Sequence, residues 1–161
     1  MGRAVILGID PGLANTGWAL LSGGDLIDFG CVRTKKSKRT VTGDVPRRLM
    51  EVSSALRPLL RSSSVAVVEW PGGGFGKNAR SAVQTNLVAG LVVGLATASG
   101  TTLLQPSPRT WRAQLGSKSG ADSKLHKNLY KRFSSQLERL LLGELPHVLD
   151  AIGLATYGEA L

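Results

Sequence analysis

The chain has 161 residues and a mass of 17.0 kDa, the size of one domain, so we expect residues 1–161 to form a single domain. Hydrophobic residues make up 42% of it, which excludes a wholly disordered chain, and no apolar run reaches the roughly 18 residues of a membrane span. The net charge of +9 indicates a polyanionic partner such as nucleic acid, with an anionic membrane as a weaker rival.

The compartment follows from the N-terminus and the cysteine content. The sequence begins with the apolar run of residues 5–9 and has no charged-then-apolar leader, so we see no export signal. Cys31 is the single cysteine and cannot form an internal disulfide, which is typical of a reducing compartment. We therefore expect a cytoplasmic protein.

The first half of the chain predicts four strands and one helix. Short β-branched or alternating runs predict strands at residues 5–9, 16–21, 26–32 and 65–69, the second and third joined by a Ser-Gly-Gly-Asp turn. The polar and basic residues 33–43 should form a loop. Pro46 suits the first turn of a helix that runs to about Arg61.

The second half predicts a fifth strand among helices. A Gly-rich loop at residues 72–76 leads into an apolar helix over 78–98, of the kind that is wedged between a sheet and another element. The remaining elements are a strand at 101–105, a helix opened by the Ser107-Pro108 cap and ending at Leu115, and helices over 122–142 and 146–158. This order predicts an α/β fold with a five-stranded mixed sheet.

Two segments hold most of the positive charge, fourteen of the twenty basic residues. The first contains Arg33, Lys35, Lys36, Lys38, Arg39, Arg47 and Arg48, and the second contains Arg109, Arg112, Lys118, Lys124, Lys127, Lys131 and Arg132. Concentrated cations favour a polyanion because each neutralised phosphate releases counterions. A solvated basic surface kept for solubility is the plainer alternative.

Three carboxylates and one imidazole are candidates for chemistry. Asp10 and Glu69 each end a buried strand, where ligands gather in an open α/β sheet. His147 and Asp150 are three residues apart and share one face of the last helix. Such a mostly oxygen donor set suits Mg²⁺, with Mn²⁺ as a substitute, and two ions can activate water against a phosphodiester. Taken singly, each residue has a plainer interpretation as a turn, a strand end or a solvated side chain.

These residues also carry a resemblance to a known family. The run of residues 6–12, ILGIDPG, followed by Thr16-Gly17, resembles the opening of the RuvC family of Holliday junction resolvases, which has a ribonuclease H-like fold. Further similar stretches cover most of the chain: residues 30–35 (GCVRTK), 46–49 (PRRL), 67–69 (VVE), Lys77-Asn78 with Ser81-Ala82 and Gly90, and 147–151 (HVLDA) with Leu154-Ala155.

The resemblance implies a metal-dependent nuclease that acts as a homodimer on four-way DNA junctions and makes paired, symmetric nicks. It implies that Asp10 bridges two metal ions, that Glu69 and Asp150 are further ligands, and that His147 ligates a metal or handles a proton near the attacking water. Phe75 resembles the loop aromatic that wedges against bases, with Trp70 as a substitute although its place beside Glu69 favours packing. The basic residues implied as DNA contacts are Lys77, Arg112, Lys118 and Lys124.

The chain also departs from the family pattern. Its loop before Lys77 is longer and Gly-rich, Ala89 stands where many members have Arg, and residues 109–112 and 118–120 have no residue-level match. These departures indicate a divergent member, such as a phage-encoded one, and leave open whether a branch-migration motor is a partner. Three alternatives remain: a nuclease for flaps, forks or RNA–DNA hybrids, a non-catalytic DNA-binding module, and an actin-like ATPase or sugar kinase, which requires a much longer chain.

Overall fold

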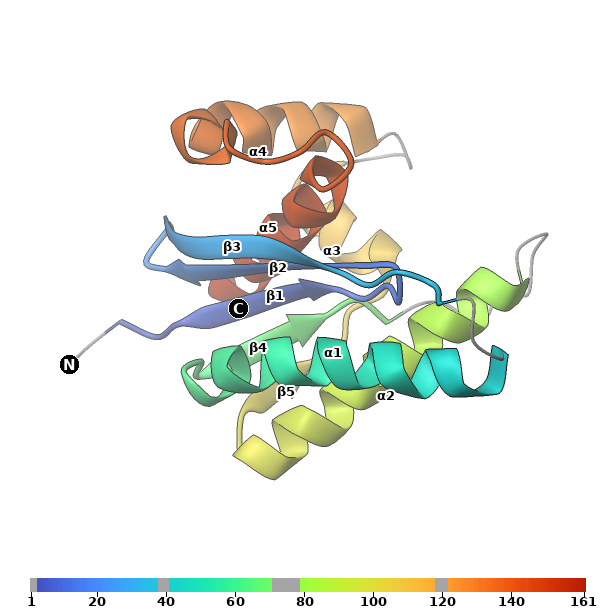
Figure 1. The fold of residues 1–161 in the computed structure, drawn as a ribbon. Coiled ribbons are helices and arrows are strands. Elements are labelled where there is room, and N and C mark those ends of the chain that lie inside the picture. Colours follow the sequence, from blue (N-terminus) through green and yellow to red (C-terminus); the bar gives the residue numbers. More distant parts are fainter. Residues whose placement is uncertain (1–2, 38–40, 71–78, 118–121) are drawn as a thin grey trace.

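The computed structural model describes residues 3–37, 41–70, 79–117 and 122–161, which form one five-stranded sheet with helices on both faces (Figure 1). The strands are β1 (Ile6–Asp10), β2 (Asn15–Ser22), β3 (Asp25–Arg33), β4 (Val65–Val68) and β5 (Thr102–Leu104). The helices are α1 (Val41–Arg61), α2 (Ala79–Ser99), α3 (Pro108–Gln114), α4 (Asp122–Leu137) and α5 (Leu145–Glu159).

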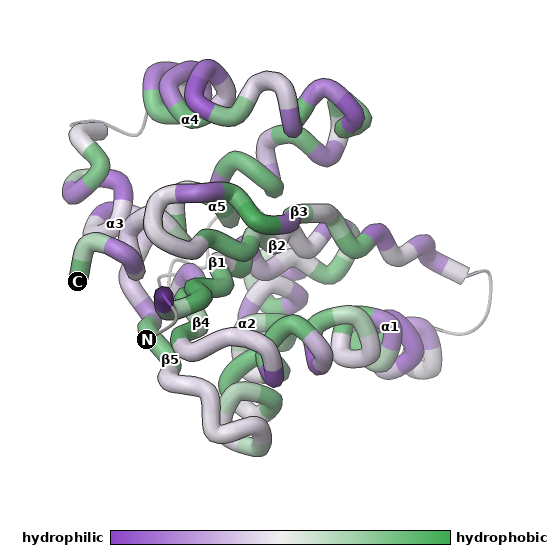
Figure 2. The backbone as a smooth tube through the Cα atoms, turned by 90° about the vertical axis from the view of Figure 1, so that its left-hand side faces the viewer, coloured by the Kyte–Doolittle hydropathy of each residue, from purple (hydrophilic) through white to green (hydrophobic). Residues whose placement is uncertain are grey.

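The strand order is β3-β2-β1-β4-β5. β1, β2 and β3 form an antiparallel meander, whereas β1, β4 and β5 run parallel, so the predicted five-stranded mixed sheet is confirmed. Helices α1 and α2 cover one face and α5 covers the other, with α3 and α4 beside it (Figure 1). The strands in the middle of the sheet are apolar on both faces, and Figure 2 shows this apolar band continuing into α5.

Two predicted helix boundaries were wrong. Helix α1 begins at Val41, so Pro46 lies inside the helix rather than opening it. A proline just past the first turn removes only one helical hydrogen bond, and this long helix tolerates that loss. Helix α4 ends at Leu137 rather than Leu142, after a non-helical residue at Phe133 (φ −120°, ψ 21°). The side chains of Phe133 and Leu137 are buried in the core beneath the kink.

Helix α2 is less enclosed than its composition predicts. Its buried residues are Val88, Ala89, Val92 and Ala96, which pack with the sheet and α1, while Val83 and Leu87 are 48% and 43% exposed. By length and composition it is the one helix among the described residues that could cross a membrane. A single such helix is weak support for a membrane span, because helices that pack in a protein core pass the same test. The helix thus packs against the sheet and α1, as a helix between a sheet and another element should, but part of its apolar surface is left exposed.

Helix α5 lies unusually close to the sheet, and two glycines make this possible. A Cβ atom on Gly8 of β1 would overlap the carbonyl oxygen of Ala151, and one on Gly17 of β2 would overlap the carbonyl oxygen of His147. The helix therefore crosses β1 and β2 at backbone contact distance. Its first turns are consequently held at the end of β1 where Asp10 lies.

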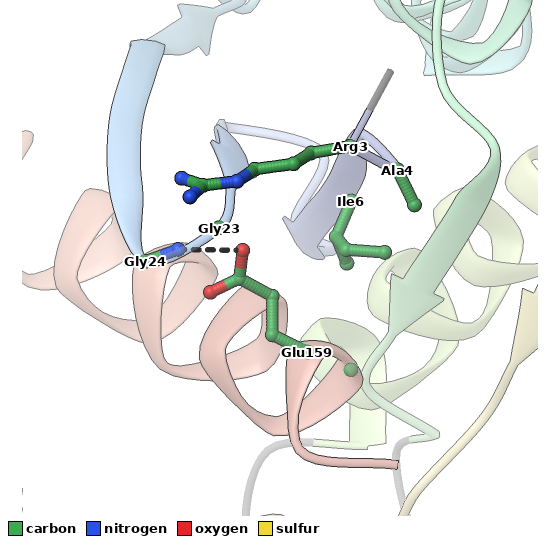
Figure 3. A pocket seen from close by; sticks show the side chains of 7 residues that line it. Arg3, Ala4, Ile6, Gly23, Gly24 and Glu159 are labelled. Atoms are coloured by element: carbon green, nitrogen blue, oxygen red, sulfur yellow. Dashed lines mark hydrogen bonds between the residues drawn. The ribbon is translucent and has the colours of Figure 1, made fainter. Parts of the chain in front are cut away.

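The opposite end of β1 borders a cavity of about 480 Å³ (Figure 3). Its lining includes Arg3 and Ile6 from the start of the chain and Glu159 from the end of α5. The Gly24 amide donates a hydrogen bond to Glu159 Oε1 over 3.0 Å, which ties the β2–β3 turn to α5. This cavity is far along β1 from Asp10, so it is separate from the candidate site.

Candidate active site

Asp10 and Glu69 come together at the carboxyl ends of two neighbouring parallel strands. The register pairs Ile9 of β1 with Val68 of β4, and the Glu69 amide donates a hydrogen bond to the carbonyl of Ile9. The residues that follow this pair, Asp10 and Glu69, therefore both carry a carboxylate, and each of these side chains is 17% exposed. The sequence predicted this pairing from the two strand ends alone.

Helix α5 brings His147 to the same place. His147 Nδ1 lies 2.8 Å from Asp10 Oδ2, in a hydrogen bond that joins residues 137 positions apart. Burial raises the pKa of Asp10, and the hydrogen bond to Asp10 raises the pKa of His147. The two side chains therefore share one hydrogen bond, and the protonation of the imidazole decides which of them donates.

Glu69 is surrounded by groups from α3. The Trp111 indole N–H donates a 2.7 Å hydrogen bond to Glu69 Oε2, and the Arg112 guanidinium lies 3.7 Å from the same oxygen. Burial raises the pKa of Glu69 to about 7, the carboxylates Asp10 and Asp150 add to the rise, and the Trp111 hydrogen bond opposes it. Glu69 is therefore partly protonated at neutral pH when no other cation neutralises it.

Asp150 completes the set from the second turn of α5. Its Oδ1 lies 2.9 Å from His126 Nε2 of α4 and 3.7 Å from Arg112. Arg112 thus stands between Glu69 and Asp150 as a shared cation. Sequence reasoning missed both His126 and Trp111. The one available signal was a lone tryptophan in the otherwise polar helix α3.

The donor chemistry of this cluster fits a divalent metal ion of the Mg²⁺ type. Asp10, Glu69 and Asp150 supply carboxylate oxygens, and Asp10 and Asp150 each raise the pKa of Glu69, a repulsion that a bound cation would relieve. As the side chains stand, no three His, Cys, Asp or Glu residues of the described segments converge closely enough to hold an ion. Arg112 supplies the nearby positive charge instead, 3.7 Å from carboxylate oxygens of Glu69 and Asp150.

The predicted DNA contacts fall into two groups. Phe75, Lys77 and Lys118 lie outside the described residues. Arg112 lies inside the carboxylate cluster, with its side chain 20% exposed, rather than on open surface. Lys124 is exposed on α4 and shares a helix face with the exposed Lys127 and Lys131, which follow at i+3 and i+7.

Two cations of the first basic segment have partners within the fold. Arg48 is buried, and its Nε donates a 2.7 Å hydrogen bond to Thr34, whose hydroxyl donates to the carbonyl of Leu13. Arg47 pairs with Asp44 and Glu51. Counting Arg48 as a cation for a polyanion was therefore wrong, because its side chain is buried, whereas Arg47 is 42% exposed and its place in the basic segment stays a prediction.

Trp70, the substitute for the loop aromatic, is 49% exposed rather than packed. Its backbone N–H donates to the carbonyl of Pro106 over 2.9 Å. This bond fixes the main chain directly after Glu69 while the indole remains accessible to solvent.

Comparison with known proteins gives matches over most of the chain. The family model for crossover junction endodeoxyribonuclease RuvC matches residues 6–153. A crossover junction endodeoxyribonuclease RuvC of Chlorobium phaeovibrioides is 31% identical over 124 residues, covering 73% of this chain and 62% of that protein. The corresponding protein of a Synechocystis species is 41% identical over 63 residues, covering 36% of this chain and 35% of its own length. The aligned parts thus span less than two thirds of these relatives.

The fold is similar to that of Thermus thermophilus RuvC, solved in complex with a Holliday junction substrate. The TM-score is 0.70 at 19% identity, and the match covers 96% of this chain and 92% of that one. A second structure of the same protein gives a TM-score of 0.69. This likeness establishes the ribonuclease H-like fold expected from the sequence. Since the family model covers nearly the whole chain, the protein belongs to the RuvC family of crossover junction endodeoxyribonucleases.

Proposed function

We propose that this chain is a metal-dependent endonuclease that resolves four-way DNA junctions. The observation that carries the proposal is the meeting of Asp10, Glu69, His147 and Asp150 at one edge of the sheet in a member of this family. The junction-bound relative supports the substrate class. We further propose that residues 1–161 act as one nuclease domain in the cytoplasm, where DNA is accessible.

The roles of the residues follow from their contacts. Asp10, Glu69 and Asp150 would hold two Mg²⁺ ions, with Mn²⁺ able to substitute, and His147 would complete the set. The bound ions supply an activated water and stabilise the leaving oxygen of the phosphodiester. With Asp10 ionised, His147 Nδ1 would donate to its carboxylate, and the other ring nitrogen would be the acceptor for a proton from the attacking water.

DNA binding would use the cations that the fold leaves accessible. Arg112 lies 3.7 Å from two of the carboxylates, so we propose that it contacts the scissile phosphate once their charge is neutralised. Lys124, Lys127 and Lys131 form an exposed row on α4 that suits a phosphate backbone. Phe75 and Lys77 stay as proposed contacts at the crossover, with the half-exposed Trp70 as a second stacking candidate.

We also propose a homodimer, because paired nicks on opposed strands need two sites. The exposed apolar residues Val83 and Leu87 of α2 support this, since their burial against a second copy would remove apolar area from water. A dimer would place one carboxylate cluster on each of two junction strands.

The test separates cleavage from binding. Asp10→Asn, Glu69→Gln and Asp150→Asn remove metal ligands without changing the basic surface, so each should abolish junction cleavage in Mg²⁺ while junction binding persists in EDTA. The comparison variant Asp28→Asn changes an exposed carboxylate on β3, which accepts from the Phe29 backbone N–H and lies 3.7 Å from exposed Arg139, and should cut normally. Full activity in a cluster variant would remove that residue from the site.

A further inference from the structure

Trp111 stands out among the groups that the proposed mechanism does not use. It is the largest fully buried side chain of the described residues, yet its helix, α3, has only seven residues and is otherwise polar. Apolar burial alone does not require a tryptophan, because a phenylalanine or leucine would also fill a core position. What distinguishes the indole is its single N–H, which is directed at the carboxylate of Glu69 over 2.7 Å.

The indole ring is seated by a specific feature of α5. A Cβ atom on Gly153 would lie 2.6 Å from Cζ3 of the Trp111 ring, so only glycine leaves room for the ring. Gly153 follows Asp150 by three residues and lies on the same side of the helix. The ring therefore fills the space between the helix that carries Asp150 and the strand end that carries Glu69.

The hydrogen bond also determines which oxygen of Glu69 is engaged. Oε2 accepts from the indole and faces Arg112, whereas Oε1 has no hydrogen bond with any residue in the described ranges. An indole N–H donates only and does not titrate, so the donor of this bond is unchanged across the working pH range. By contrast, the contact of His126 with Asp150 depends on the tautomer of the imidazole. A fixed donor of this kind limits the rotation of the carboxylate and reduces the entropy lost when a ligand binds.

We propose that Trp111 is a positioning residue for Glu69, and that the indole N–H and its seat at Gly153 orient this carboxylate to present Oε1 to a divalent cation. Arg112 is held in the same assembly, because its guanidinium stacks on the Trp111 ring with Cζ 4.7 Å from the ring centroid. The role towards a metal rests on the proposed function. The hydrogen bond itself does not, which allows the two to be tested separately.

The first experiment uses the metal-free, ¹⁵N-labelled full chain. Its three tryptophans give three indole N–H resonances, and Trp111→Phe identifies one of them by its disappearance. We expect Glu69→Gln, measured at pH 8 where the carboxylate is mostly ionised, to shift the Trp111 resonance more than that of Trp18, because it replaces a charged acceptor with a neutral amide. An unmoved Trp111 resonance would overturn the proposal, whatever the chain does to DNA.

The second experiment measures affinity for Mg²⁺. Titration with MgCl₂, followed at the backbone amides around Asp10, should show Trp111→Phe binding about 10- to 100-fold more weakly, since that is the usual effect of losing a partner of a metal ligand. Trp18→Phe, the same exchange on β2, should bind as the unsubstituted chain does. A purely packing role predicts equal affinity for both variants, and that result would refute the positioning role.

Gly153→Ala provides an independent perturbation that retains the indole. The added methyl group would displace the ring, so we expect the same loss of Mg²⁺ affinity and a shifted Trp111 resonance. If this variant fails to fold, Trp111→Phe decides the question alone. If the unsubstituted chain binds no Mg²⁺, the proposed nuclease function fails, while the metal-free spectra still decide whether Trp111 holds Glu69.

Discussion

At the scale of single residues, the site is a set of acids that each depend on a neighbour. Asp10 is hydrogen-bonded to His147, Glu69 accepts from Trp111, and Asp150 contacts His126. The acids themselves were predicted from the sequence because each ends a strand or shares a helix face. Trp111 and His126 were not, since their contacts arise only when α3 and α4 pack beside α5.

The first prediction concerns His147. The family resemblance allows His or Asp at this position, so His147→Asp should retain more junction cleavage in Mg²⁺ than His147→Ala, because Asp still offers an oxygen ligand beside Asp10. Initial cleavage rates at saturating Mg²⁺ compare the two variants. Equal loss in both would count against a ligand role for His147.

The second prediction is a pH dependence of metal binding. Burial raises the pKa of Glu69 from 4.5 to about 7, so below this pH a proton must leave before a cation binds. Mg²⁺ affinity should therefore fall by up to about tenfold per pH unit below pH 7 and level off above it. Glu69→Gln, which cannot titrate, should flatten this profile, and a flat profile in the unsubstituted chain would contradict the account.

The raised pKa of Glu69 also makes the stability of the metal-free fold depend on pH. An acid whose pKa is raised on folding stabilises the folded state below its unfolded pKa, and this contribution disappears as the pH rises through the folded value. From Glu69 alone, stability without metal should decline between about pH 4.5 and 7. Urea unfolding in EDTA measures it, and the decline should be smaller in Glu69→Gln.

At the scale of elements, the close approach of α5 to the sheet determines where the site forms. Gly8 and Gly17 let the helix backbone contact β1 and β2, which brings His147 to Asp10. Strand positions were well predicted because short β-branched runs are local signals. The ends of α1 and α4 were not, because Pro46 is tolerated inside a long helix and burial of Phe133 and Leu137 ends α4 early.

The third prediction tests this close approach. Gly8→Ala should lower the free energy of unfolding by at least about 2 kcal/mol, since the new methyl group overlaps the backbone of α5. Gly94→Ala on α2 is the matched control: nothing lies within 4 Å of its Cβ, and alanine favours a helix by about 1 kcal/mol over glycine. Urea unfolding compares them, and a stable Gly8→Ala variant would refute the backbone contact.

At the scale of the whole molecule, the proposed paired nicks require two copies of the chain. Residues 79–99 form an apolar helix whose outer residues are exposed in one chain, and the sequence could not tell whether the sheet or a partner covers them. Composition gives the apolarity of a helix, but only the position of the neighbouring elements determines which side is enclosed.

The fourth prediction addresses this surface. Changing Val83 and Leu87 together to Glu should convert a dimer to a monomer and remove paired nicking, because it places charge in the proposed interface. Leu142→Glu, at a residue that is 90% exposed before α5, should leave the mass unchanged. Sedimentation equilibrium reports the mass, and a dimeric double variant would move the interface elsewhere.

The central claim is junction resolution, and cleavage of a labelled synthetic four-way junction in Mg²⁺ tests it most directly. Matched duplex, flap and fork substrates are incubated with the protein in parallel. The account predicts paired, symmetric nicks on the junction and little cutting of the others. Equal cutting of flaps and forks would contradict it in favour of a general structure-selective nuclease, and tight binding without cleavage in Mg²⁺ or Mn²⁺ would leave only a DNA-binding module.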